Sequence, residues 1–368
     1  MTRSLAIIAL YSTLNASAAS YYFSTSGNDA NDGLSPATPF KTLTKIASLT
    51  PAPGDALLLK AGDTFDTIAT FYSAGTSNAP IVMDRYDVGA NPIIAGDNPN
   101  AAWSAITNGV YSTTPAAAAT VEILASPSGT VYAKAANTNG YEAWPNWTWA
   151  IDGSQVLARA DGAAPVAGTH LYQYCAVTAG RAYITVRNLD IRRARFAVQF
   201  GGDGCRMQNC SVSDCANSAA LWSGNYSGIQ VTSNNIARVG YTAIYSQFSH
   251  NGYIAYNTIA TVTNVINGAN IGGGELCGIG LQQGTNNVVE HNSISDTAQS
   301  FVDFYYEADA QVRYNYGVGT ADLVAAPMGT GIKLHHNIFV TNGGKGFSSS
   351  HSWDAGLSPA PDTGPVVI

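Results

Sequence analysis

The chain has 368 residues, of which only 11% are charged and 46% are hydrophobic, whereas about 25% of residues are charged in an ordinary soluble domain. The hydrophobic content excludes an intrinsically disordered chain, and no apolar run is long enough to predict a membrane-spanning helix. With 17 basic against 24 acidic residues the net charge is −7, which argues against nucleic-acid binding. We therefore expect a large β-rich protein whose surface is polar mainly through Asn, Ser, Thr, Gln and Tyr.

The N-terminus has the pattern of a secretory signal. Arg3 supplies a positive start, Leu5 to Leu14 form a short apolar segment, and Ala16-Ser17-Ala18 offer the small residues of a cleavage site. We predict a signal peptide over residues 1–18 and a mature protein that is secreted or periplasmic. A frayed N-terminal strand is the alternative interpretation.

A series of short motifs follows over residues 19–100. It runs through Gly27-Asn-Asp29, Asp32-Gly33, Pro39-Phe40-Lys41, Pro53-Gly54-Asp55, Ala61-Gly62-Asp63 and Ala74-Gly75-Thr76. This series resembles the N-terminal signature of bacterial right-handed parallel β-helix proteins that act on polysaccharides, the pectin-lyase-like superfamily. The resemblance implies that Thr42 to Leu49 form a helical cap over the open end of the β-helix, where the first coil would otherwise expose its core and an unpaired edge.

Residues 101–180 break this pattern. Four tryptophans gather here with several prolines: Trp103, Trp144, Trp147, Trp149, Pro115, Pro145 and Pro165. The stretch from Trp147 to Arg159 predicts a β-hairpin with a type I′ turn at Asp152-Gly153. We predict an inserted β-rich subdomain, whose tryptophans either form a local core or stack on sugar rings.

An internal repeat runs through the second half of the chain. Its phrase is an apolar residue, two variable residues, Asn, one variable residue and an apolar residue. The Asn position is occupied in successive copies by Leu189, Cys210, Asn234, Asn257, Asn292, Asn315 and Asn337. The steps between these positions are 21, 24, 23, 35, 23 and 22 residues, so the basic period is about 22.

This period, with short strands and no helical pattern, predicts a parallel β-helix in which each coil adds one strand to each of three sheets. Asn at a fixed turn position would hydrogen-bond to Asn of the next coil in a ladder, and Asn tolerates the left-handed backbone of such turns. The predicted fold is all-β: a right-handed single-stranded parallel β-helix with a short N-terminal helical cap and the inserted subdomain. Residues 181–345 would form the coils with the Asn ladder, and residues 346–368 a C-terminal tail.

A second strand precedes most ladder positions, with copies at Ala243–Ser246, Gly278–Leu281 and Phe301–Phe304. Strand alternation then predicts two inward rows and two outward rows. The inward rows are Ile244, Ile279, Val302 and Ser246, Leu281, Phe304; the outward rows are Tyr245, Gly280, Asp303 and Gln247, Gln282, Tyr305. The 35-residue step carries about twelve extra residues near Asn264 to Cys277, and we expect this loop to project beside the sheet that holds Asp303.

The five cysteines predict little chemistry. They are Cys175, Cys205, Cys210, Cys215 and Cys277. Their odd number leaves at least one free thiol or an intermolecular bond, and a spacing of five residues does not match a zinc site. Buried small side chains, with at most one disulfide, are the favoured interpretation.

Acidic and aromatic residues form the first candidate site. Glycoside hydrolysis usually needs one carboxyl group as general acid and a second carboxylate as nucleophile or base. We assign Asp303 as nucleophile or base and Glu275, on the inserted loop, as general acid, with Glu307 in reserve for either role. The neighbouring outward residues would bind substrate: Tyr305, Gln282, Gln247, Tyr245 and Tyr306. Solvated turn residues or a surface strand position are the alternative interpretations of these acids.

A basic constellation is the second candidate. Alternation places Arg313 and His335 in one outward row with Glu290, and Lys333 lies on the same face as His335. A polysaccharide lyase needs a base and cations that neutralise a uronate carboxylate, which Lys333, Arg313 and His335 could supply. An ion-paired ladder of small energetic value, from Glu290 to Arg313, is the alternative.

The resemblance does not decide between these activities, because the superfamily includes glycoside hydrolases, polysaccharide lyases and epimerases. The lyases related to chondroitinase B place a Lys and an Arg near the strand of Asp303, where this chain has Gln282, Gln283, Tyr305 and Tyr306. The paired Asp-Asp motif of polygalacturonases is also missing from the sequence.

Our leading hypothesis is an exported glycoside hydrolase that acts on a polysaccharide or oligosaccharide as a monomer, without nucleic acid or a membrane span. A uronate lyase or C5-epimerase is the alternative, and a non-catalytic β-helical carbohydrate-binding protein or adhesin is the second alternative. No cofactor or metal is expected. Calcium near Asp303, Glu307 and Asp309 stays open, although no calcium-loop spacing supports it.

Overall fold

The structure is a computed structural model. It describes residues 18–98, 102–107, 109–114, 123–125, 132–135, 138–139, 145–160, 170–172, 175–263, 265–266, 269–270, 275–319, 322–325, 330–341, 347–348 and 366–367. The signal peptide predicted over residues 1–18, apart from Ala18, therefore lies outside the described residues. So do Trp144, most of the extra loop before Glu275, and most of the predicted tail.

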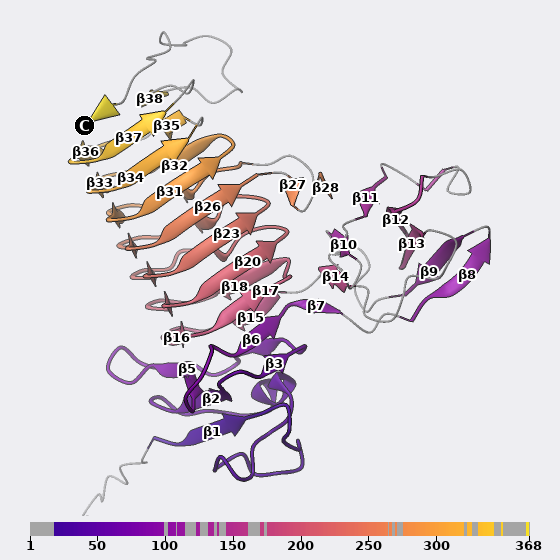
Figure 1. Ribbon diagram of the computed structural model, residues 1–368. Coiled ribbons are helices and arrows are strands. Elements are labelled where there is room, and N and C mark those ends of the chain that lie inside the picture. The colour runs from indigo at the N-terminus through magenta and orange to yellow at the C-terminus, as the bar shows by residue number, and fades with distance from the viewer. Residues whose placement is uncertain are drawn as a thin grey trace, which may run out of the picture.

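Three long sheets wrap around one core and form a parallel β-helix, as predicted (Figure 1). Sheet A consists of β1 (Ser20–Phe23), β2 (Ala56–Lys60), β5 (Ile81–Tyr86), β16 (Ile184–Arg187), β19 (Arg206–Gln208), β22 (Gln230–Thr232), β25 (Tyr253–Ala255), β30 (Val288–Glu290), β33 (Gln311–Arg313) and β36 (Lys333–His335). Each of these strands pairs in parallel with the strand one coil away.

Sheets B and C complete each coil. Sheet B consists of β3 (Thr64–Phe65), β6 (Ile93–Ala95), β17 (Asp190–Arg192), β20 (Ser211–Cys215), β23 (Asn235–Val239), β26 (Thr258–Val262), β31 (Ser293–Thr297), β34 (Tyr316–Gly319), β37 (Ile338–Thr341) and the antiparallel β39 (Val366–Val367). Sheet C consists of β4 (Ala69–Thr70), β15 (Cys175–Ala179), β18 (Phe196–Phe200), β21 (Ala220–Ser223), β24 (Ile244–Gln247), β29 (Ile279–Gln282), β32 (Ser300–Tyr305), β35 (Asp322–Ala325) and β38 (Phe347–Ser348). A typical coil is therefore β24, β25, β26.

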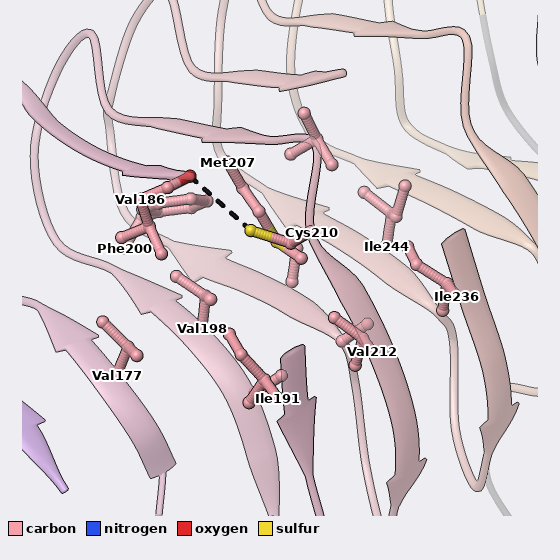
Figure 2. Packing of buried hydrophobic residues seen from close by; sticks show 14 of the residues in the cluster. Val177, Val186, Ile191, Val198, Phe200, Met207, Cys210, Val212, Ile236 and Ile244 are labelled. Carbon is pink, nitrogen blue, oxygen red and sulfur yellow. Dashed lines mark hydrogen bonds between the residues drawn. The ribbon is translucent and has the colours of Figure 1, made fainter. Parts of the chain in front are cut away.

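The core fills the interior of the tube with stacked apolar side chains (Figure 2). Val177 and Val198 of sheet C face Ile191 and Val212 of sheet B across this interior. Full burial of one such aliphatic side chain stabilises the fold by about 1.5–3 kcal/mol. Because the same inward positions recur in every coil, the apolar rows run along the axis of the tube.

The predicted Asn ladder is present. Asn234, Asn257, Asn292 and Asn315 each donate a hydrogen bond from Nδ2 to Oδ1 of the Asn in the next coil, at 2.9–3.0 Å, and the last acceptor is Asn337. Cys210 occupies the same position one coil earlier, where its backbone N–H donates to Asn234 Oδ1 and its thiol faces Val186 O (Figure 2). The ladder satisfies backbone groups that every buried turn would otherwise leave without partners.

The residue before each ladder position lies in the left-handed region. This column, which we call the ladder corner, is Asn188, Asn209, Ser233, Tyr256, His291, Tyr314 and His336, with φ between +52° and +59°. Small polar residues adopt this conformation readily, whereas Tyr and His do so at a cost. Tyr256, His291 and Tyr314 offset part of that cost by stacking, since successive ring centroids lie 5.0 and 5.1 Å apart.

The helical cap predicted over Thr42–Leu49 is not seen. The segment forms only a 3-10 turn, η1 (Leu43–Ala47), which contacts β4, the first strand of sheet C. Asp29 Oδ1 fixes the chain before the turn by accepting the N–H groups of Lys41 and Thr42, and a proline follows at position 51. The segment between these points is shorter than about 12–15 residues, the length below which an isolated α-helix is only marginally stable in water.

An inserted β-rich part projects from the side of the β-helix, as predicted (Figure 1). One sheet contains β8 (Ser104–Thr107), β9 (Val110–Thr113), β11 (Ala133–Lys134), β12 (Thr148–Asp152) and β13 (Gln155–Arg159); another contains β7 (Asp97–Asn98), β10 (Ile123–Ala125) and β14 (His170–Tyr172). β15 lies within the insertion predicted over residues 101–180, but it pairs with β4 and β18 and so belongs to the β-helix.

The predicted hairpin joins β12 to β13, but its turn differs from the prediction. Asp152 pairs with Gln155, so the two turn residues are Gly153 and Ser154. Gly153 has φ +57° whereas Ser154 is not left-handed. A type II′ turn, with Gly at its first central position, has this pattern, while type I′ would need both residues left-handed. Trp149 is buried in the local core of this part together with Tyr132 and Val156.

Candidate active site

Sheet C presents the predicted outward rows in the predicted register. Tyr245 pairs with Gly280 and Gly280 with Asp303, and in the next row Gln247 pairs with Gln282 and Gln282 with Tyr305. Gly280 leaves room for its neighbour, because a Cβ there would lie 3.0 Å from Thr242 Cγ2 and 3.4 Å from Tyr245 Cδ2. The ring of Tyr245 therefore lies across the glycine toward the next strand.

A chain of hydrogen bonds links three predicted residues. Tyr245 Oη donates to Gln282 Oε1 at 2.6 Å, and Gln282 Nε2 donates to Glu275 Oε2 at 2.8 Å. Because Oε1 of Gln282 accepts the hydrogen bond from Tyr245, the amide nitrogen of Gln282 faces Glu275. The backbone carbonyl of Glu275 is held in turn by Thr242 Oγ1 at 2.9 Å. Glu275 thus has a fixed position although it ends the inserted loop, whose hairpin of β27 (Val265–Ile266) and β28 (Ala269–Asn270) lies against β11.

Asp303 lies beside this chain in a buried position. Its side chain is 1% exposed, and the thiol of Cys277 donates to Asp303 Oδ2 at 3.9 Å. The same sulfur lies 3.0 Å from Ser300 Oγ. Burial raises the pKa of the Cys277 thiol well above its ordinary value, and the negative charges of Asp303 and Glu275 act in the same direction. Cys277 is therefore a neutral neighbour and not a nucleophile.

The pKa values of two tyrosines are affected by both carboxylates. Burial raises the pKa of Tyr241 to about 12, and the charges of Glu275 and Asp303 add to this effect. Burial likewise raises the pKa of Tyr245, with contributions from Tyr241 and the same two acids. No Lys, Arg or His contributes to the pKa of Tyr241, Tyr245 or Cys277 within the described residues. Glu275 and Asp303 therefore both lie near Tyr241, Tyr245 and Cys277, and the two carboxylates belong to one electronegative site.

Sequence reasoning missed Tyr241, Thr242 and Cys277. Tyr241 has the same outward parity as Tyr245, and their rings meet edge to face with centroids 5.8 Å apart. Strand alternation could not have found it, because Tyr241 lies three residues before β24 begins. Thr242 and Cys277 precede β24 and β29 by two residues each, so they belong to the turn and not to the strands that the repeat defines.

Glu307 does not join the two other acids. It is 1% exposed, and its carboxyl oxygens accept hydrogen bonds from Gly284 N at 2.8 Å and Asn287 Nδ2 at 2.6 Å. Burial raises the pKa of Glu307 to about 7, while these two hydrogen bonds lower it. A Cβ on Gly284 would lie 2.8 Å from Glu307 Oε2 and 2.0 Å from Ser249 O, so the glycine makes room for this carboxyl. Glu307, in the turn that follows β32, therefore binds the turn that follows β29 in the preceding coil.

Aromatic residues flank the carboxylate site at the end of the sheet C strands. Phe248, Gln283 and Tyr306 follow β24, β29 and β32, and all three are left-handed, with φ of +57°, +55° and +53°. We call this column the site corner. Phe248 and Tyr306 are 41% and 47% exposed, and the Tyr306 ring meets Tyr305 edge to face at 4.6 Å. Gln247 accepts a hydrogen bond from Ser223 Oγ, one coil earlier.

The basic constellation lies on sheet A, on strands β30, β33 and β36. Arg313 Nε donates to Glu290 Oε2 at 2.5 Å, and Tyr253 Oη donates to the other oxygen of Glu290 at 2.5 Å. His335 pairs with Arg313 in the next coil, but its Nδ1 lies 2.9 Å from Nδ1 of His336. Arg313 is thus neutralised by Glu290, as the ion-paired ladder interpretation predicts.

The remaining expectations concern cysteines, metals and membranes. All five cysteines are free thiols, and all but Cys175 are buried. In the described part of the chain, no group of three or more His, Cys, Asp or Glu side chains is arranged to hold a metal ion. Over those same residues no helix is long and apolar enough to cross a membrane.

Comparisons with known proteins agree with this architecture. Residues 174–355 match the family model described as the right handed beta helix region. One curated relative, lacto-N-biosidase of Bifidobacterium longum subsp. longum, is 37% identical over 93 residues, and the match covers 23% of this chain and 6% of that protein. The chain therefore spans only a small part of that relative.

Solved structures show the same fold at low sequence identity. The GH136 lacto-N-biosidase from Eubacterium ramulus superposes with a TM-score of 0.58 at 17% identity, over 89% of this chain and 57% of that one. The complex of XylC with xylose gives a TM-score of 0.55 at 14% identity, over 89% of this chain and 68% of that one. By the strand pairing, the family model and these structures, the chain is a right-handed parallel β-helix protein.

Proposed function

We propose that this chain is the β-helix of a glycoside hydrolase that cleaves an uncharged glycan with Glu275 and Asp303. One observation carries the proposal: Gln282, which donates a hydrogen bond to Glu275, lies on β29, and the neighbouring strand β32 places Asp303 opposite Gly280. Two carboxyl groups at one site meet the basic requirement of glycoside hydrolysis. The names of the relatives, a lacto-N-biosidase and a structure with xylose, support a carbohydrate as the substrate.

In the proposed mechanism Glu275 is the general acid. The hydrogen bond from Gln282 Nε2 to Glu275 Oε2 orients this carboxyl group, which gives its proton to the leaving oxygen of the glycosidic bond. Asp303, on the opposite side of Gly280 from Tyr245, is the nucleophile or the base that activates water. Its negative charge also stabilises the positive charge that develops on the sugar in the transition state.

A uronate lyase is less compatible with this site. Such an enzyme must neutralise the substrate carboxylate, and an anionic sugar would be repelled by Glu275 and Asp303. Arg313, one of the candidate cations, lies on sheet A and not on sheet C, and it donates a hydrogen bond to Glu290. A lyase at sheet A would therefore first have to break that ion pair.

The test compares carboxylate variants on neutral and uronate glycans. We expect new reducing ends without the ultraviolet absorbance of an unsaturated product, and we expect Glu275→Gln and Asp303→Asn each to lower kcat by at least about a hundredfold. Asp309→Asn, an exposed acid at a left-handed position, is the matched control and keeps full activity. Full activity in either carboxylate variant, or an unsaturated product, contradicts the proposal.

We also propose that the protein is exported, because residues 1–18 have the pattern of a secretory signal. We further propose that it acts as a monomer. N-terminal sequencing of the protein from the culture medium or periplasm should find a start near Ala19, and light scattering should give the mass of one chain. Retention in the cytoplasm with Met1 intact contradicts export, and the mass of a dimer contradicts the monomer.

A further inference from the structure

The two aromatic corners of the β-helix correspond coil by coil. Tyr256, His291 and Tyr314 of the ladder corner each lie eight residues after Phe248, Gln283 and Tyr306 of the site corner, on the same three coils. At the ladder corner the middle coil supplies a ring: His291 stacks on Tyr256 at 5.0 Å and 4°, and on Tyr314 at 5.1 Å and 9°. The ladder corner therefore shows what fills the space between two aromatic residues two coils apart.

At the site corner this middle ring is missing. Phe248 and Tyr306 are separated by two coil spacings, about 10 Å, and Gln283 stands between them without a ring. The side chain of Gln283 is exposed, and its amide makes no hydrogen bond to any described residue. No ring stacks on Phe248 either, as far as the described residues show. At the site corner, two exposed aromatic side chains and the Gln283 amide thus border the position that the His291 ring fills at the ladder corner.

This place adjoins the carboxylate site. The backbone N–H of Phe248 donates to the carbonyl of Gln282 at 2.8 Å, and that of Gln283 donates to the carbonyl of Tyr305 at 2.8 Å. The side chain of Gln282 holds Glu275. From Gly280 to Gln283 the strand advances about 10 Å, so a ligand at the corner lies beyond the sugar that Glu275 and Asp303 would contact.

We propose that the site corner is a distal subsite in which one sugar ring of an extended, uncharged glycan inserts between Phe248 and Tyr306, above Gln283. The apolar C–H faces of a pyranose pack on the two aromatic side chains, and the Gln283 amide hydrogen-bonds to its hydroxyls. This role explains why Phe, Gln and Tyr occupy left-handed positions that Gly, Asn or Asp would adopt at lower cost. The path of the glycan from Glu275 and Asp303 to the site corner rests on the proposed function, whereas sugar binding at the site corner does not depend on it.

The decisive variant fills the gap. Gln283→His places at the site corner the ring that His291 already supplies at the ladder corner, with the same φ of +55°. His291→Gln is the matched control, since it removes a ring from the other corner. Phe248→Ala removes one wall of the subsite. Thermal unfolding of each variant separates a loss of binding from a loss of fold.

Binding is measured by calorimetry in a Glu275→Gln background. The probes are neutral oligosaccharides of increasing length from xylan, β-glucan and galactan, with oligogalacturonates and alginate oligosaccharides as charged counterparts. We expect Gln283→His and Phe248→Ala to weaken binding of the longest neutral ligands by about tenfold and to leave the shortest unaffected. With Glu275 restored, both variants should raise KM on long substrates and leave kcat unchanged. His291→Gln should bind like the parent protein.

The inference is overturned if no neutral oligosaccharide binds, if Gln283→His binds the long ligands as tightly as the parent, or if the charged ligands bind as tightly as the neutral ones. An equal loss in His291→Gln also overturns it, because the effect would then come from the fold. Failure of the proposed function gives a different result. In that case the glycan binds and responds to Gln283→His, but it is not hydrolysed.

Discussion

Asn292→Ala should destabilise the β-helix more than any loss of apolar area at that position would suggest. The Asn292 side chain is 1% exposed and lies in the middle of the ladder. Its Oδ1 accepts from Asn257 N at 3.0 Å and from Asn257 Nδ2 at 2.9 Å. Its Nδ2 donates to Ile254 O at 3.0 Å, to Asn315 Oδ1 at 3.0 Å and to Glu290 O at 3.1 Å.

The expected loss of stability follows from which partners of Asn292 would be left without a hydrogen bond. Asn257 N–H would lose its partner outright, whereas Asn257 Nδ2 keeps Val231 O and Asn315 Oδ1 keeps the backbone N–H of residue 292. One fully stranded buried group costs about 1–3 kcal/mol, and each partly satisfied group costs a fraction of that. We expect Asn292→Ala to lower the free energy of unfolding by about 3–4 kcal/mol.

Guanidinium denaturation followed by circular dichroism measures this difference. Asn235→Ala is the matched control, because Asn235 lies next to ladder residue Asn234 but is exposed on β23. The control should stay within about 0.5 kcal/mol of the wild type. If Asn292→Ala unfolds at the same denaturant concentration as Asn235→Ala, the ladder contributes nothing beyond its backbone and the reasoning is wrong.

Two further predictions concern residues around the site. Glu307 has a pKa raised by burial to about 7, against 4.5 for the ordinary group, so the folded state binds this proton more tightly than the unfolded state does. The contribution of Glu307 to the free energy of unfolding should be largest near or below pH 4.5, and it should fall by up to about 3 kcal/mol as pH rises through 7. In Glu307→Gln this part of the pH dependence of stability should vanish. A pH dependence that persists in the variant would refute the assignment. Gly280→Val should push the Tyr245 ring off the strand, because even a Cβ at this position would lie 3.0 Å from Thr242 Cγ2 and 3.4 Å from Tyr245 Cδ2. We expect about a tenfold fall in kcat on the neutral glycan. Gly180→Ala is the control, because a Cβ there would make only ordinary contacts, the nearest at 3.5 Å from Phe71 O.

Much of the architecture could be predicted because the β-helix repeats a local rule. The spacing of Asn234, Asn257 and Asn315 fixes where each coil turns, and alternation then places Tyr245, Gly280 and Asp303 in one row. The contact between Glu275 and Gln282 could not be predicted in the same way. It depends on how the inserted loop returns to β29, and no periodic pattern describes that path.

Two of the predictions that differed concern turns. The segment after Thr42 is predicted to be a helical cap, but between the Asp29 contacts and Pro51 it forms a 3-10 turn. The hairpin at Gly153 uses a type II′ turn, because the pairing of Asp152 with Gln155 moves the turn forward by one residue. In both cases the residues chosen for the element were correct, and the constraint that decided its geometry came from neighbouring segments.

Glu307 shows most clearly where alternation stops being informative. Alternation along β32 correctly separates outward Asp303 from inward Phe304, but Tyr306 is left-handed, and one left-handed residue reverses the direction in which the following side chains point. Glu307 therefore turns into the protein, where Gly284 and Asn287 bind it, although the odd-numbered parity of Asp303 and Tyr305 places it outward. The same reversal makes Phe248, Gln283 and Tyr306 project at the corner and not across the sheet. Reading a β-helix site from sequence thus requires the left-handed corners to be located first, because each of them restarts the count of inward and outward positions.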